Sequence, residues 1–131
     1  MESNKEKALT DQKDYLWIQI RELPYFRGLL RSVEAKFYQD LELKAPILDL
    51  GCGDGHFASR TFDFQIDVGI DPWKGPLYEA AKTGAYRNVI RCEGADIPFP
   101  DCYFQTIISN SVLEHIPEVD AVVIEAGRVI K

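Results

Sequence analysis

The sequence predicts an α/β fold in which a parallel sheet of about four strands carries helices on both faces. From residue 46 onward, short apolar runs alternate with stretches of helical periodicity, which is typical of βαβ units. The runs are apolar on both faces, as in strands of a sheet covered on both sides. With 131 residues, of which 46% are hydrophobic, the chain is long enough for one such domain with a real core.

The part of the chain ahead of the sheet is expected to be flexible at first and then helical. Residues 1–14 are rich in charge and poor in apolar side chains, so we expect a flexible N-terminus. Residues 15–45 form an N-terminal helical segment, because apolar residues recur at helical spacing from Tyr15 onward. Pro24 suits the first turn of a helix and predicts that a second helix begins there. The core domain then covers residues 46–131.

Within that core, the pattern predicts four strands and three helices. Apolar runs indicate the strands, and amphipathic stretches between and after them indicate the helices. The expected strands are 46–50, 66–71, 88–92 and 103–109, and the expected helices lie near 55–62, 76–83 and 118–130.

The charge of the chain argues against a nucleic-acid partner. The formal net charge is -6, and the excess acid lies in residues 46–131, which hold thirteen Asp and Glu against seven Lys and Arg. An acidic surface repels phosphate backbones, so a small or neutral substrate is favoured.

Neither a membrane segment nor a disulfide framework is expected. No apolar run is long enough to cross a membrane, and the polar N-terminus lacks a secretory signal, so the sequence is typical of a cytoplasmic protein. The chain has three cysteines, Cys52, Cys92 and Cys102. Because this number is odd and no pair has CxxC spacing, we expect reduced thiols and no metal site.

A glycine-rich loop follows the first predicted strand. Gly51, Gly53 and Gly55 are spaced G-x-G-x-G, and glycine permits both positive φ and close approach of the backbone to a ligand. The dinucleotide fingerprint requires a further glycine where this chain has His56. The loop is therefore either a tight turn without a ligand or a site for a nucleoside-bearing ligand, and the mismatch at His56 disfavours NAD as that ligand.

Carboxylates follow successive strands of the predicted sheet. Asp49 lies in the first strand, Asp71 ends the second, and Asp96 follows the third. In an open α/β sheet, ligands bind at the carboxyl ends of the strands, where these three acids converge. Asp71 could accept hydrogen bonds from ribose hydroxyls, but an acid before Pro72 is also a common turn residue. A cluster of acids suits a cationic ligand better than a phosphate.

Three segments together resemble a known family: ILDLGCGDGHFA, then VGIDPW, then GADIPFPDCYFQTIISNSVLEHIPEVDAVVIEAGRVIK. Over roughly residues 46–131 the chain is similar to class I S-adenosylmethionine-dependent methyltransferases of the small-molecule type, such as those of ubiquinone and menaquinone biosynthesis. The resemblance implies a Rossmann-like fold, S-adenosyl-L-methionine as cofactor, and transfer of its methyl group to a small-molecule or lipid-type acceptor.

The resemblance also implies a role for each matching residue. The glycine loop would line the methionine moiety, an acid beneath it would lie near the amino group, and the second-strand acid would hold the ribose. Other positions would flank or contact the adenine or close over the methionine end. The implied cofactor-binding residues are Asp49, Gly51, Cys52, Gly53, Asp71, Pro72, Trp73, Asp96, Ile97, Asn110 and Ser111.

His115 is the candidate catalytic residue. It stands where such enzymes often place a histidine facing the methyl-transfer site, and a neutral imidazole could orient or deprotonate an acceptor hydroxyl near pH 7. The competing interpretation is a loop histidine that fixes the turn before the last helix.

The resemblance implies seven strands in the order 3-2-1-4-5-7-6, whereas the present sequence ends at Lys131, where the turn into a fifth strand would begin. We therefore expect an open edge along Tyr103 to Ser109, and self-association or lowered stability as a result. The alternatives to a catalytic methyltransferase are a non-catalytic cofactor-binding or interaction module derived from one, and an NAD-dependent oxidoreductase.

Overall fold

The structure is a computed structural model that describes residues 13–131. Most of the expected flexible N-terminus, residues 1–14, therefore lies outside the described residues. The chain forms two compact units, a helical one that ends at Asp40 and an α/β one from Leu41 to Lys131. In the described part of the chain, no helix has both the length and the apolar character needed to cross a membrane.

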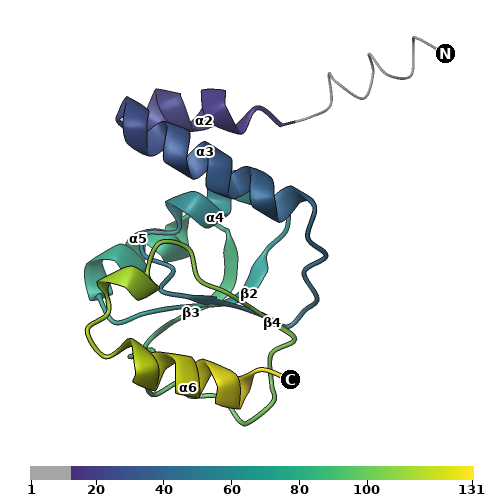
Figure 1. The fold of residues 1–131 in the computed structure, drawn as a ribbon, viewed down its shortest axis with the longest axis vertical. Helices are drawn as coiled ribbons and strands as arrows, with labels where there is room; N and C mark the ends of the chain where they lie inside the picture. The colour runs from purple at the N-terminus through teal and green to yellow at the C-terminus, as the bar shows by residue number, and fades with distance from the viewer. Residues whose placement is uncertain (1–12) are drawn as a thin grey trace, which may run out of the picture. The chain divides into compact units, whose positions relative to one another are not determined.

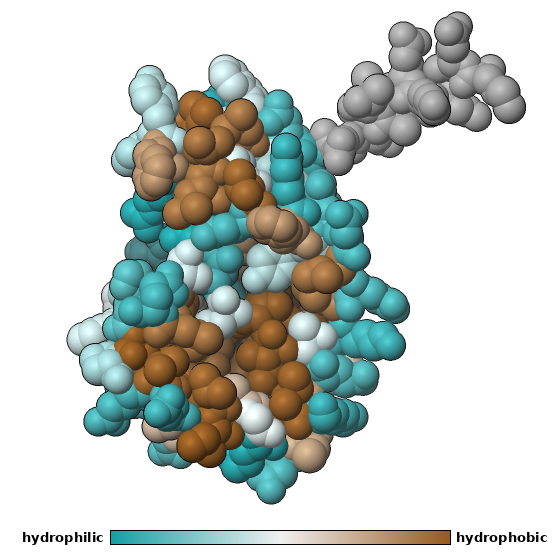
Figure 2. All heavy atoms as spheres, in the orientation of Figure 1, coloured by the Kyte–Doolittle hydropathy of each residue, from teal (hydrophilic) through white to brown (hydrophobic). Residues whose placement is uncertain are grey.

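The helical unit consists of α2 (Tyr15–Glu22) and α3 (Tyr25–Gln39). Asp14 caps α2, because its Oδ1 accepts a hydrogen bond from the Trp17 amide at 2.9 Å. Pro24 precedes α3, where its fixed φ suits the entry to a helix. Apolar side chains are exposed on α2 and α3 in the view of Figure 2. The exposed aromatic side chains of this unit are Trp17, Tyr25, Phe26 and Phe37.

The α/β unit is built on a four-stranded parallel sheet, as the sequence predicts. Its strands are β1 (Ile47–Leu50), β2 (Ile66–Asp71), β3 (Tyr86–Arg91) and β4 (Thr106–Ile108), in the order β3-β2-β1-β4. β1 is central and pairs with β2 on one side and with β4 on the other. The carboxyl ends of β1, β2 and β3 therefore meet at one edge of the sheet.

Helices cover both faces of this sheet (Figure 1). α4 (His56–Thr61) and α5 (Lys74–Lys82) lie on one side and α6 (Val119–Val129) lies on the other. A short 3-10 turn, η1 (Leu113–His115), connects β4 to α6. The predicted Rossmann-like α/β fold is confirmed for the part of the chain that the structure describes.

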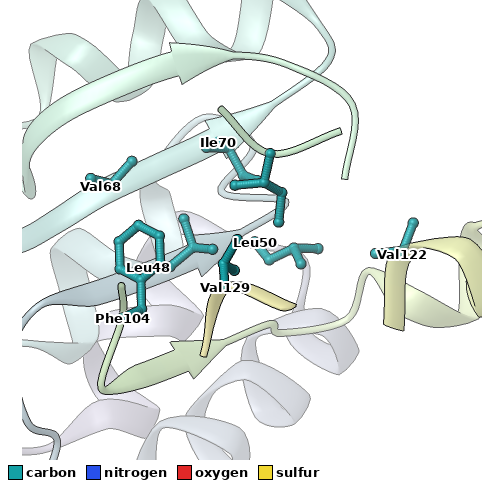
Figure 3. Close-up of a cluster of buried hydrophobic side chains, with 8 residues drawn as sticks. Leu48, Leu50, Val68, Ile70, Phe104, Val122 and Val129 are labelled. Atoms are coloured by element: carbon teal, nitrogen blue, oxygen red, sulfur yellow. The ribbon is translucent and has the colours of Figure 1, made fainter. Parts of the chain in front are cut away.

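The main core lies between the sheet and α6. Leu48 and Leu50 of β1 point to the same face, because side chains alternate along a strand. They pack with Val68 and Ile70 of β2, with Phe104, and with α6 (Figure 3). The same alternation sends Asp49, Gly69 and Asp71 to the opposite face, beneath the loop that leads into α4. The pleat thus separates the packing face from the polar face.

Among the strands, β3 and β4 depart furthest from the predicted bounds. β3 begins at Tyr86 and not at residue 88, so this tyrosine belongs to the sheet. β4 is shorter than the predicted 103–109, because the Phe104 amide donates to the Val129 carbonyl and the Phe104 carbonyl accepts from the Lys131 amide, both at 2.9 Å. The expected open edge is therefore partly paired by the chain that follows α6.

Candidate functional site

The site is formed around the loop between β1 and α4. Gly51, Gly53 and Gly55 all have positive φ, at 78°, 55° and 76°, which explains why each is glycine. A Cβ at Gly51 would lie 2.5 Å from the Val112 side chain, so the loop is packed tightly there. A Cβ at Gly53 would meet nothing within 4 Å. The loop is thus closed against the protein at Gly51 and open at Gly53.

The backbone amides of this loop are used within the protein. The Gly51 and Cys52 amides both donate to the Ile70 carbonyl of β2 at 2.9 Å. The Gly53 amide donates to Asp71 Oδ2 at 3.1 Å, and the Gly55 amide donates to the Cys52 carbonyl at 3.1 Å. Four of the loop's amide donors, those of Gly51, Cys52, Gly53 and Gly55, are therefore turned inward.

This arrangement determines the charge of a ligand that the loop can accept. Loops that bind pyrophosphate do so with free amides at the start of a helix. Here four loop amides are already satisfied, and the amide at the start of α4, that of His56, donates to Asp54 Oδ1 at 3.0 Å. The nearby side chains are carboxylates, so the loop favours a cationic group over a phosphate.

Asp49 lies beneath the loop and accepts a hydrogen bond from a residue that the sequence analysis did not identify. The Tyr86 hydroxyl of β3 donates to Asp49 Oδ2 at 2.6 Å. Asp49 is only 6% exposed, and burial raises its pKa to about 6, opposed by the tyrosine hydrogen bond and reinforced by the nearby Asp71. Burial likewise raises the pKa of the Tyr86 hydroxyl, with Asp49 adding to the effect. The two residues are 37 positions apart, and no spacing rule links them.

Asp71 connects the loop to the turn that follows β2. Its Oδ2 accepts from Gly53 and its Oδ1 accepts from the Trp73 amide at 2.9 Å. Asp71 is thus a turn residue, as one of the two interpretations of the sequence predicts. Each carboxylate oxygen has a second lone pair, so the side chain can still accept from a ligand hydroxyl.

The residues predicted to contact an adenine lie on two turns. Pro72 is half-buried, and Trp73 immediately precedes α5 and is 70% exposed. Asp96 is exposed on the loop after β3, and the Ile97 side chain is buried beside it. The Ile97 amide donates to Glu125 at 2.9 Å and its carbonyl accepts from Arg128 at 2.9 Å, so both groups face α6.

Glu125 and Arg128 of α6 hold the loop after β3, and sequence reasoning gave them no role. Arg128 donates to Glu125, to the Ile97 and Phe99 carbonyls, and to Asp101. The guanidinium and the Ile97 amide lower the pKa of Glu125 to about 2. Glu125 and Arg128 are three positions apart on a helix, which is a common spacing for surface ion pairs. The sequence therefore gave no sign that this pair anchors a loop.

The segment after β4 lies beside the glycine loop. The Ser109 hydroxyl donates to the Leu50 carbonyl at 2.9 Å, and Val112 packs against Gly51. The half-buried Asn110 and Ser111 lie between these two anchors, and Ser111 has a positive φ of 55°. They are therefore next to the methionine end of the predicted site.

His115 is placed differently from the carboxylates. It ends η1, its side chain is 78% exposed, and its Nε2 lies 3.8 Å from Glu114 Oε1. The imidazole faces solvent, with an exposed carboxylate as its neighbour. Its part in catalysis stays a prediction.

The fold and the site define the class to which the protein belongs: an α/β domain of Rossmann-like topology with a glycine loop and buried acids at the carboxyl edge of the sheet. The chain matches the family model described as "Methyltransferase domain" over residues 48–131 and belongs to that family. The expected class of enzyme and its cofactor, S-adenosyl-L-methionine, are thereby confirmed for the family.

Individual relatives agree with this assignment. The chain is 33% identical over 95 residues to a human protein named "Probable tRNA methyltransferase 9B", a match that covers 70% of this chain and 20% of that one. An S-adenosylmethionine-dependent methyltransferase of Thermotoga maritima superposes with a TM-score of 0.68 at 21% identity, over 82% of this chain and 52% of that one.

A third match holds a ligand. Geranyl diphosphate C-methyltransferase of Streptomyces coelicolor, solved with Mg2+, geranyl diphosphate and S-adenosyl-L-homocysteine, has a TM-score of 0.65 at 21% identity. The match covers 92% of this chain and 48% of that one. The present chain thus spans about half the length of both solved structures.

Proposed function

We propose that this chain binds S-adenosyl-L-methionine across the glycine loop and supplies the cofactor half of a methyltransferase. The observation that carries the proposal is the loop itself, four of whose amides are turned inward while two buried carboxylates, Asp49 and Asp71, lie next to it. The cofactor carries positive charge at its sulfonium and its ammonium group, so an acid-lined loop whose amides are largely satisfied within the protein fits it. The same feature argues against NAD, which needs donors for its pyrophosphate.

The proposal assigns residues of the chain to each part of the cofactor. Gly51, Cys52 and Gly53 line the methionine moiety, and Asp49 beneath them receives the ammonium group. Asp71 holds the ribose from a position that Gly53 and Trp73 fix. The remaining predicted contacts are Pro72, Trp73 and Asp96 around the adenine, Ile97 as the buried anchor of that loop, and Asn110 and Ser111 over the methionine end.

The chemistry of the reaction requires positioning above all. S-adenosyl-L-methionine supplies an activated methyl group, which an O, N, S or C nucleophile displaces in line with the leaving sulfur. The chain's residues hold the cofactor so that its methyl points to the acceptor, and such orientation accounts for much of the acceleration in two-reactant steps. His115 would orient an acceptor hydroxyl.

A small-molecule or lipid-type acceptor is the class that the charge of the chain favours. The net charge is -6, and a phosphate backbone would be repelled by the acidic α/β unit. The human relative is named for tRNA, which makes RNA the competing acceptor. The expected absence of a nucleic-acid partner is therefore part of the proposal.

A second candidate function is a non-catalytic cofactor-binding or interaction module. It is favoured by one observation, that the predicted catalytic residue His115 has a side chain that is 78% exposed and lies beside Glu114. Such a module would bind the cofactor without transferring its methyl group.

The test uses S-adenosyl-L-methionine with a labelled methyl group, incubated with the chain and with separate pools of small metabolites, lipids and tRNA. We expect label in the small-molecule or lipid pool. Label in tRNA would contradict the acceptor class. Binding of the cofactor with no label transferred to any pool would favour the second candidate.

A further inference from the structure

Tyr86 is the buried titratable group nearest the glycine loop to which the proposed function gives no role. It begins β3, its side chain is 8% exposed, and its hydroxyl donates to Asp49 Oδ2 at 2.6 Å. A bond this short between a hydroxyl and a carboxylate is typical of a strong, charge-assisted hydrogen bond. Tyr86 occupies only one oxygen of the carboxylate and leaves the other for another donor.

The ring of Tyr86 is held between two glycines of the site. A Cβ at Gly69 of β2 would lie 2.9 Å from two carbons of the ring, and a Cβ at Gly55 would lie 3.1 Å from a third. The absence of side chains at these positions is therefore what lets the ring pass beneath the loop. The packing fixes the ring, and the ring fixes where the hydroxyl donates.

We propose that Tyr86 is a positioning residue of the cofactor site, whose hydroxyl holds the Asp49 carboxylate in place to receive the ammonium group of the methionine moiety. The inference deepens the proposed function and depends on it. A carboxylate held by one short hydrogen bond on a rigid ring presents its second oxygen in a fixed direction. Fixing it in advance lowers the cost of ordering the site when the ligand binds.

The burial and the charged neighbours of Asp49 make its protonation state depend on this hydrogen bond. Burial raises the pKa of Asp49, and the Tyr86 hydroxyl is the contact that lowers it. The charge of Asp71 on β2 adds a smaller increase, and Cys52 and Asp54 of the loop lie close enough to interact with the pair. Without that hydroxyl, Asp49 takes up its proton at a higher pH and loses its attraction for an ammonium group.

The experiment compares two ligands that differ in the group at issue. S-adenosyl-L-homocysteine carries the amino acid end, whereas 5′-methylthioadenosine has the same adenosine without it. Calorimetry with both ligands is carried out on the wild type, on Tyr86→Phe, and on Tyr78→Phe as a matched control. Tyr78 lies on α5 and is 64% exposed.

For Tyr86→Phe we expect S-adenosyl-L-homocysteine to bind about tenfold more weakly at neutral pH, which is ~1.4 kcal/mol. 5′-Methylthioadenosine should bind as it does to the wild type, and Tyr78→Phe should change neither ligand. The fall in S-adenosyl-L-homocysteine affinity on acidification should begin at a higher pH in Tyr86→Phe. In an Asp49→Asn background, Tyr86→Phe should have no further effect on affinity, because the two residues act together.

An equal loss for both ligands would show that Tyr86 only supports the fold, and would overturn the proposal. Unchanged affinity for S-adenosyl-L-homocysteine, or an undiminished effect in the Asp49→Asn background, would overturn it as well. A wild type that binds neither ligand would instead overturn the proposed function, and this inference with it.

Discussion

Asp49 is held at the site at a cost to the stability of the folded protein. Its pKa is raised from 3.8 to about 6, so between these values the folded state binds a proton that the unfolded state has released. Stability from this group is therefore fully present below pH 4 and is lost as the pH rises through 6. The difference amounts to at most about 3 kcal/mol for a shift of this size.

Replacing Asp49 with asparagine should remove that cost. Asparagine keeps an acceptor for Tyr86 but never ionises, so we expect Asp49→Asn to melt at a higher temperature than the wild type above pH 6. The two proteins should converge towards pH 4. Thermal melts across pH 4–8 measure the difference, and a variant that is less stable than the wild type at pH 7.5 would contradict the assignment of Asp49 as a buried carboxylate.

Asp71 should contribute to ligand binding both directly and through the loop. We expect Asp71→Ala to weaken binding of S-adenosyl-L-homocysteine by about 1 to 3 kcal/mol, the range for hydrogen bonds that involve a charged group. Asp71→Asn should lose less, since it retains one acceptor for Gly53 or Trp73. Calorimetry measures both, and equal affinities for wild type and Asp71→Ala would leave Asp71 as a turn residue only.

At the level of the elements, the order of strands and helices could be predicted from the sequence because it depends on local periodicity. The four strands and three helices of the core follow from apolar runs and amphipathic stretches. The glycine positions also follow, since positive φ restricts the choice of residue. What local patterns cannot supply is a contact across the sheet.

Three contacts between residues far apart in the sequence show what local patterns cannot predict. The Tyr86–Asp49 hydrogen bond joins residues 37 positions apart, and the Ile97–Glu125 bond joins residues 28 apart. The start of β4 depends on Phe104 pairing with Ile130, a contact with the chain beyond α6. Each depends on tertiary packing, which periodicity does not encode.

The pair Glu125 and Arg128 should control the order of the loop that carries Asp96. We expect Arg128→Ala to free the Ile97 and Phe99 carbonyls and to speed hydrogen exchange at the Ile97 amide, with a lower melting temperature. Arg87→Ala is the control, because Arg87 is 65% exposed and lies 3.7 Å from its partner Asp67. Exchange mass spectrometry measures the loop, and an unchanged Ile97 amide would contradict its role as an anchor.

For the whole molecule, we propose self-association along the edge of β4. Among the described residues β4 has one neighbouring strand, β1, and the following helix α6 exposes Val123 at 53% and Ile124 at 74%. Unprotected strand edges and apolar patches recruit other chains. We expect light scattering to show association that rises with concentration and weakens in Ile124→Lys. A monomer at high concentration with the melting behaviour of an ordinary domain would contradict this proposal.

The most direct test of the central claim is calorimetric binding of S-adenosyl-L-homocysteine to the wild type, to Gly53→Val and to Gly84→Val. Both glycines have positive φ and open space around them, but Gly53 lies in the loop and Gly84 precedes β3, at the opposite end of the sheet. The two variants carry similar backbone strain, and only the first obstructs the proposed site. The account predicts binding to the wild type and to Gly84→Val and none to Gly53→Val. Unchanged affinity in Gly53→Val would contradict it.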